Sequence, residues 1–154
     1  MNDIGKSLIV ISGVIGLYLL FRPKWQIPLA GKKYAALFDF VEKNYGLPHN
    51  LLARMAQQES GYNASEVGSA GEIGLLQIYP EMHPECTGNL YDPATNLQCA
   101  AEYLAKLYDQ FGRWSLAIAA YNWGQGNLVK KGFSAAPAVT KQYVAKVTGD
   151  LRLT

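Results

Sequence analysis

The sequence has 154 residues, of which 49% are hydrophobic and 17% are charged, and its formal net charge is +2. This length and composition predict a folded chain with one substantial core and exclude an intrinsically disordered protein. The 14 basic and 12 acidic side chains are scattered and nearly balanced, so no nucleic-acid partner is expected.

The N-terminal segment differs from the rest, because residues 7–21 (SLIVISGVIGLYLLF) carry no charge and are mostly apolar. As a helix this run would be about 22 Å long, somewhat shorter than a hydrocarbon core of ~30 Å. Trp25 suits an anchor at the membrane interface. We expect residues 1–31 to form a membrane-anchor helix and a linker; a cleaved signal peptide and a buried core helix are the alternatives.

Helical periodicity dominates residues 32–154, which we expect to form one mainly α domain without alternating strands. The expected helices cover residues 34–45, 48–59, 93–111, 114–123 and a last segment that starts near Pro137. The pair Asp92-Pro93 is a strong start signal, because Asp caps helix N-termini and Pro suits the first helical position. Residues 74–79 (GLLQIY) are too few to distinguish a helical turn from a strand.

Two cysteines, Cys86 and Cys99, flank a segment rich in turn-forming residues. A bridge between them would close a loop of roughly 14 residues, so we expect a disulfide formed outside the cytosol; two buried thiols in a reducing compartment are the alternative. The basic residues after the apolar N-terminal run instead place the domain in the cytoplasm, so the two signals conflict. His49 and His83 show no metal-ligand spacing with the cysteines, and neither a metal nor a cofactor is expected.

Glu59 lies on the apolar face of its expected helix, because Leu51, Leu52 and Met55 precede it by eight, seven and four positions. Burial and a helix C-terminus both disfavour a negative charge, which predicts a raised pKa for Glu59. A carboxyl group that stays protonated near neutral pH can serve as a general acid. A solvated charge and a paired core carboxylate are the structural alternatives.

Four short motifs follow one another in a fixed order along the chain: ES at 59–60, GLLQI at 74–78, AYN at 120–122 and YV at 143–144. In this order and spacing they resemble the catalytic domain of the soluble lytic transglycosylases, which has a lysozyme-like fold with a substrate cleft. The resemblance covers about residues 33–150. It implies that peptidoglycan glycan strands are the partner and that no cofactor is used.

The resemblance also implies roles for single residues. Glu59 would be the only acid/base, and the glycan would be bound by Ser60, Gln77, Tyr121, Asn122 and Tyr143. Glu59 would protonate the β-1,4 oxygen that leaves N-acetylmuramic acid, and the 2-acetamido group of that sugar would meet the oxocarbenium-like centre. Glu59 would then deprotonate the 6-hydroxyl that attacks C1, which gives a 1,6-anhydromuramoyl product.

Glu72 departs from the family pattern, which usually has a small residue there. We expect a surface charge on the loop; the alternative is a second carboxylate that activates water, as in a goose-type muramidase. A catalytically inactive glycan-binding module is a further alternative for the whole domain. The small size favours local opening of the cell wall, from a phage virion membrane or from the periplasmic side within a secretion or conjugation machine.

Overall fold

The computed structural model describes residues 25–149 and residue 151. The apolar run 7–21 lies outside the described residues, so the membrane anchor remains a prediction. Within the described part, no helix is both long enough and apolar enough to cross a membrane.

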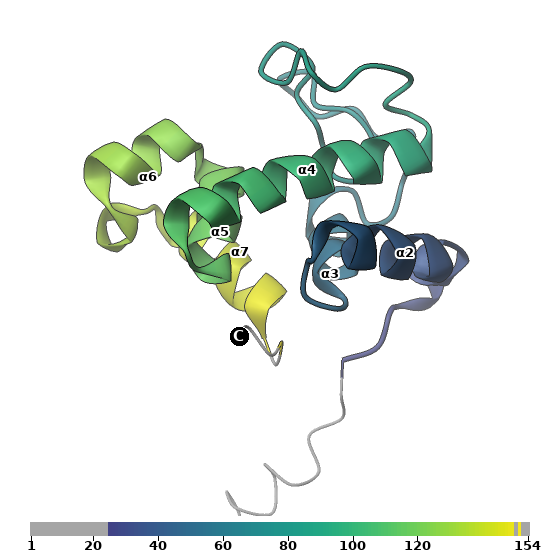
Figure 1. Ribbon diagram of the computed structural model, residues 1–154, viewed down its shortest axis with the longest axis horizontal. Coiled ribbons are helices and arrows are strands. Elements are labelled where there is room, and N and C mark those ends of the chain that lie inside the picture. The colour runs from purple at the N-terminus through teal and green to yellow at the C-terminus, as the bar shows by residue number, and fades with distance from the viewer. Residues whose placement is uncertain (1–24, 150, 152–154) are drawn as a thin grey trace, which may run out of the picture.

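Helices provide nearly all of the regular structure in the described residues. In chain order they are η1 (Leu29–Tyr34), α2 (Ala35–Tyr45), α3 (Leu51–Glu59), α4 (Pro93–Phe111), α5 (Trp114–Trp123), α6 (Gln125–Lys131), η2 (Phe133–Ala135) and α7 (Ala138–Thr148). Figure 1 shows α4 running across the molecule, with α2 and α3 beside one half and α5, α6 and α7 grouped at the other. The expectation of a mainly α domain is therefore confirmed.

Local chemistry sets the ends of α4 as the sequence predicts. The backbone N–H of Thr95 donates to Asp92 Oδ2 at 2.9 Å, and Pro93 occupies the first helical position. The helix ends at Gly112, whose φ of +66° lies in the left-handed region that glycine adopts without strain. This helix carries Cys99 and two residues of the site described below.

Glu42 caps α3 from a neighbouring helix, which the sequence does not reveal. Its carboxylate, on α2, accepts hydrogen bonds from the backbone N–H groups of Asn50 and Leu52, both at 2.8 Å. Helix α3 has no side-chain cap of its own, so Glu42 satisfies donors that would otherwise be unpaired. Burial raises the pKa of Glu42 to about 7, against the lowering effect of these N–H groups.

The segment 74–79 is neither a helix nor a regular strand. It forms a tight turn next to Ile73, which makes isolated β-bridges with Val67 and Ile78. Leu75, Leu76 and Ile78 are each at most 1% exposed and form part of the core. The core also includes large apolar side chains of α3, α4 and α5: Leu51, Leu52, Met55, Leu97, Leu104, Leu107 and Ile118. This burial fixes the turn firmly against the three helices.

Helix α6 was not predicted from the sequence. It follows α5 directly after Gly124, has a glycine inside it, and buries only Leu128. A short helix with a single buried side chain leaves no helical periodicity to recognise.

The predicted disulfide between Cys86 and Cys99 is present, with 5.5 Å between the two Cα atoms. It joins the loop that follows the 74–79 turn to the second turn of α4. The loop between residues 79 and 92 contains no helix or strand, so the crosslink is a principal tie between this loop and the helical body.

Reduction of this disulfide is expected to lower the free energy of unfolding by about 3 kcal/mol, the chain-entropy value for a loop of about 15 residues. Urea denaturation with and without a reductant measures this. The double variant Cys86→Ala/Cys99→Ala serves as the control, because it should match the reduced protein and show no further response to reductant. A wild-type midpoint that does not move on reduction contradicts the expectation.

Candidate active site

Glu59 is the last residue of α3, and its carboxyl group is held by a tyrosine from the far end of the chain. The hydroxyl of Tyr143, on α7, donates to Glu59 Oε1 at 2.5 Å. Tyr143 is 8% exposed, so this hydrogen bond is shielded from solvent. Contacts between α3 and α7 bring these two residues together.

Burial raises the pKa of Glu59 from its ordinary 4.5 to about 7, as the sequence predicted. The negative charge of Glu72 raises it further, and the hydrogen bond from Tyr143 acts in the opposite direction. The carboxyl group is therefore substantially protonated at neutral pH. This is the protonation state that a general acid needs.

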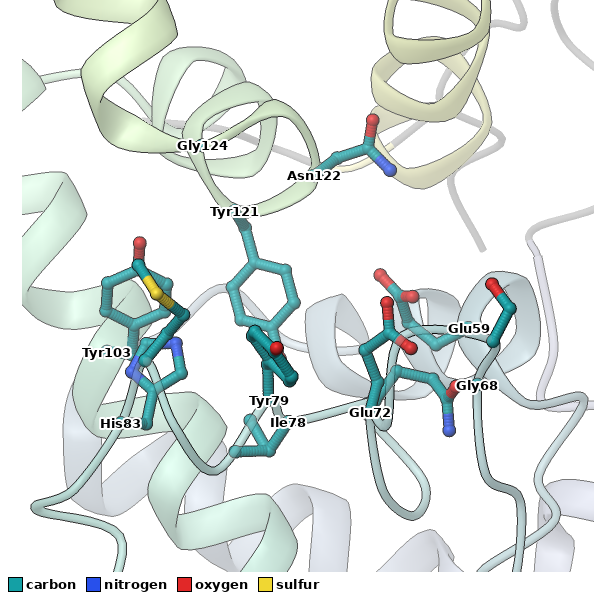
Figure 2. A pocket seen from close by; sticks show the side chains of 13 residues that line it. Glu59, Gly68, Glu72, Ile78, Tyr79, His83, Tyr103, Tyr121, Asn122 and Gly124 are labelled. Carbon is teal, nitrogen blue, oxygen red and sulfur yellow. The ribbon is translucent and has the colours of Figure 1, made fainter.

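A pocket of about 440 Å³ lies over Glu59 (Figure 2). It is lined by Glu59, Gly68, Ser69, Glu72, Gln77, Ile78, Tyr79, Met82, His83, Tyr103, Tyr121, Asn122 and Gly124. Glu59 and Glu72 lie at one end, His83 and Tyr103 at the other, and the ring of Tyr121 lies between them (Figure 2). Five of the predicted site residues, Glu59, Glu72, Gln77, Tyr121 and Asn122, thus line one pocket.

Two of the predicted residues use their hydroxyl groups to hold the 74–78 turn. Ser60 Oγ donates to the carbonyl of Leu75 at 2.9 Å, and Tyr121 Oη donates to the carbonyl of Leu76 at 2.7 Å. Ser60 and Tyr143 do not line the pocket; they lie behind its wall. Their roles as ligands of a glycan remain untested predictions, whereas their contacts with the turn and with Glu59 are structural.

Gln77 has a backbone conformation that is unusual for its residue type. Its φ is +50°, in the left-handed region that non-glycine residues seldom adopt. Its side-chain amide donates to the carbonyl of Gly74 at 2.9 Å, which closes the turn. Such local strain persists where the surrounding structure holds it, and it concentrates at functional sites.

Asn96 is a residue of the site that the sequence analysis did not single out. It is fully buried on α4, donates to the carbonyls of Ile73 and Leu90, and accepts from the N–H of Leu76, at 2.8, 3.0 and 2.8 Å. Its side chain therefore ties the turn that forms the pocket wall to the end of the 79–92 loop. The available signal was a polar side chain on the apolar stripe of a helix that starts at Pro93.

Glu72, which the sequence predicts to be a surface charge on its loop, lines the pocket. Its side chain is half-buried, and its Oε2 accepts from the N–H of Ala70 at 3.1 Å. Figure 2 shows its carboxyl group beside that of Glu59. Two carboxyl groups therefore share one end of the pocket.

The other end of the pocket is aromatic and was also missed. The rings of His83 and Tyr103 have their centroids 4.3 Å apart, and those of Tyr103 and Tyr121 are 5.6 Å apart. His83 belongs to the loop that the disulfide ties to α4. His83, Glu85 and Cys86 are close enough together to suggest a metal site, but the Cys86 sulfur is bonded in the disulfide and offers no thiolate.

The comparisons with known proteins agree with this geometry. The chain belongs to the Transglycosylase SLT domain family, because the model of that family matches residues 36–144. The resemblance inferred from the four motifs is thereby confirmed.

Relatives and solved structures extend the comparison. The chain is 27% identical over 124 residues to membrane-bound lytic murein transglycosylase C of Haemophilus influenzae, covering 68% of this chain and 35% of that protein. It is 32% identical over 110 residues to the transglycosylase of Enterobacteria phage PRD1, covering 71% and 39%. The structure resembles an inactive glutamate-to-glutamine mutant of lytic transglycosylase Slt from Pseudomonas aeruginosa, with a TM-score of 0.67, 26% identity, and coverage of 79% of this chain and 23% of that one. The match thus spans less than half of the length of each of these relatives.

Replacing Tyr143 with phenylalanine is expected to raise the pKa of Glu59 above about 7, because the hydroxyl that stabilises the carboxylate is lost. A ¹³C NMR titration of the glutamate carboxyl groups measures this. Tyr121→Phe is the matched control, since its hydroxyl donates to a backbone carbonyl and not to Glu59. A pKa that stays the same or falls in Tyr143→Phe contradicts the assignment.

Glu59→Gln is expected to stabilise the fold more at high pH than at low pH. The folded-state pKa of about 7 exceeds the ordinary 4.5, so the wild type loses stability as pH rises from 4.5 to 7 and no more above that. The free energy of unfolding of the wild type should fall by roughly 3 kcal/mol over this pH range, whereas that of the variant should not show this fall. Urea unfolding of both proteins across this range measures the difference, in which the titration of Glu42 cancels. An equal difference at both ends of the range argues against a buried, protonated Glu59.

Proposed function

We propose that this domain is a peptidoglycan lytic transglycosylase that cleaves the β-1,4 bond between N-acetylmuramic acid and N-acetylglucosamine and leaves a 1,6-anhydromuramoyl end. The observation that carries the proposal is the carboxyl group of Glu59, bonded by Tyr143 and placed at one end of a pocket in a domain of the SLT family. The similar Pseudomonas structure is that of a mutant inactivated by a glutamate-to-glutamine change, which supports a catalytic glutamate in that relative. The Haemophilus relative is likewise a lytic murein transglycosylase by name.

Glu59 acts first as an acid and then as a base. Its proton goes to the glycosidic oxygen, the C1–O bond breaks, and positive charge develops on the muramic acid ring. The 2-acetamido oxygen of the same sugar stabilises this charge. The ionised Glu59 then removes the proton of the 6-hydroxyl, whose oxygen bonds to C1, and Glu59 returns to its starting state without consuming water.

The hydrogen bond from Tyr143 helps Glu59 in both steps. A pKa near 7 balances the two tasks, because a much higher value would weaken the acid and a much lower value would weaken the base. Tyr143 donates to one carboxyl oxygen and leaves the other for the substrate. We assign Tyr143 as the positioning residue of the acid/base, a role that differs from direct glycan binding.

The pocket suits an uncharged sugar. No lysine or arginine stands among the described residues that line it. Its walls offer the amide of Asn122, the ring of Tyr121 and the side-chain oxygen of Gln77, whose NH₂ group is bonded to the backbone. Amide groups pair with hydroxyl and acetamido groups, and aromatic faces pack against sugar rings. We assign these three residues to glycan binding and Ser60 to holding the wall on which Gln77 stands.

We further propose that residues 32–154 are the catalytic unit and that residues 1–31 hold it at a membrane. The Haemophilus relative is named as membrane-bound and another relative comes from a phage. A membrane-held domain of this size would open the wall locally, as a phage does at genome entry or as a secretion or conjugation machine does during assembly. Detection of the protein in purified virions tests the phage role.

Digestion of purified peptidoglycan is expected to release muropeptides with 1,6-anhydromuramoyl ends, which are lighter by one water than reducing ends. Glu59→Gln should fold, bind peptidoglycan in a sedimentation assay and lose cleavage by at least about 100-fold. The wild-type rate should fall as pH rises through about 7, because the acid form of Glu59 disappears. Clearing of cell walls by the variant at the wild-type rate would refute the mechanism, and binding without cleavage by the wild type would indicate a glycan-binding module.

A further inference from the structure

We infer that Glu72 is a second catalytic carboxylate, which activates water so that this site hydrolyses part of the same glycosidic bonds that it cleaves by transglycosylation. The inference rests on the proposed function, since it concerns the fate of the same cleaved bond. Its consequence is a mixture of anhydromuramoyl and reducing ends from one active site.

The position of Glu72 carries the inference. Its carboxyl group lines the pocket next to that of Glu59, although the two come from different segments, the 63–74 loop and the end of α3 (Figure 2). The charge of Glu72 is close enough to disfavour ionisation of Glu59. Two carboxyl groups from different segments thus meet at one end of the pocket, and glycosidases divide the roles of acid and base between such a pair.

The loop is shaped around the Glu72 side chain. A Cβ atom placed on Gly68 would collide with Glu72 Oε2 and with Gln77 Oε1, so glycine leaves room there for both side chains. The N–H of Ala70 donates to Glu72 Oε2 at 3.1 Å and fixes its direction. A charge that only kept the loop soluble would need neither the space nor the hydrogen bond.

Among the described residues, Glu72 has no basic partner that would explain its position structurally. Throughout residues 25–149, no ion pair involves this carboxylate. Glu66 on the same loop also lacks an ion pair among the described residues, but it accepts from the side-chain amide of Asn63 at 2.8 Å and stands outside the pocket. The two glutamates therefore offer a functional residue and a matched control within one loop.

The hydrolytic route shares its first step with the transglycosylase route. Glu59 gives its proton to the leaving oxygen and the C1–O bond breaks. A water molecule then loses one proton to the Glu72 carboxylate while its oxygen bonds to C1, which forms a reducing muramic acid end. Glu72 passes that proton to solvent, Glu59 regains one, and one water is consumed in each turnover.

The ratio of the two ends tests this directly. Peptidoglycan is digested in H₂¹⁸O at about pH 5.5, where Glu59 stays protonated with or without the charge of Glu72. Mass analysis separates anhydromuramoyl ends from reducing ends that carry ¹⁸O. The wild type should give both, and Glu72→Gln should lower the reducing ends about 100-fold relative to anhydromuramoyl ends, the lower part of the range for a general base.

Two further variants make the result interpretable. Glu66→Gln should keep the wild-type ratio. Gly68→Ala, whose methyl group crowds the side chains of both Glu72 and Gln77, should shift the ratio in the same direction as Glu72→Gln. Circular dichroism confirms that each variant is folded.

The remaining outcomes separate the two claims. If the wild type forms only anhydromuramoyl ends, or if Glu72→Gln keeps the wild-type ratio, the role of Glu72 is overturned while the proposed function stands. If the wild type forms only reducing ends, the transglycosylase assignment fails and the domain is a muramidase. If it cleaves nothing, both claims fail.

Discussion

The site depends on the hydrogen bonds that hold the 74–78 turn against three helices. Ser60 on the α3 side, Asn96 on α4 and Tyr121 on α5 each bond to backbone groups of this turn. Since the turn has no ladder or helix of its own to satisfy these groups, the helices do so with side chains. Its apolar residues, Leu75 and Leu76, lock into the core beneath. The wall of the pocket is therefore part of the packed interior, although it is formed by a loop.

The energetics of Glu59 follow from that rigid surrounding. A carboxyl group with a pKa near 7 costs free energy at the pH values where it is ionised, and the rest of the fold must supply that energy. The alternative would be a flexible site that admits water and lets the pKa return to its ordinary value. Packing of α3 against α7, with Tyr143 between them, prevents this. Favourable packing elsewhere in the domain thus offsets the cost of burying the Glu59 carboxyl group at the place where an acid/base is needed.

Those parts of the fold that depend on neighbours in the sequence could be predicted. The start of α4 at Asp92-Pro93, its end at Gly112 and the raised pKa of Glu59 all follow from residues within two or three helical turns. The disulfide follows from two cysteines in a short loop.

The parts that escaped prediction depend on distant partners or on weak local patterns. The bond between Asn96 and Ile73 joins residues 23 positions apart, and that between Tyr143 and Glu59 joins residues 84 apart. No periodicity shows which carbonyl a buried amide will meet, so Asn96 went unnoticed. The place of Glu72 is set by the fold of the 63–74 loop, which brings its carboxylate to the pocket. Ordered motifs identified the family, whereas tertiary contacts decide what each residue does in it.

The capping of α3 by Glu42 has a mechanical consequence. Helix α3 is a rod of nine residues, about 14 Å long, with the Glu42 cap at one end and the carboxyl group of Glu59 at the other. A tilt of only about 10° around the capped end would move the far end by roughly 2 Å, more than a catalytic proton transfer tolerates. Glu42, a buried carboxylate on another helix, therefore helps to fix the position of the Glu59 carboxyl group by holding the opposite end of α3.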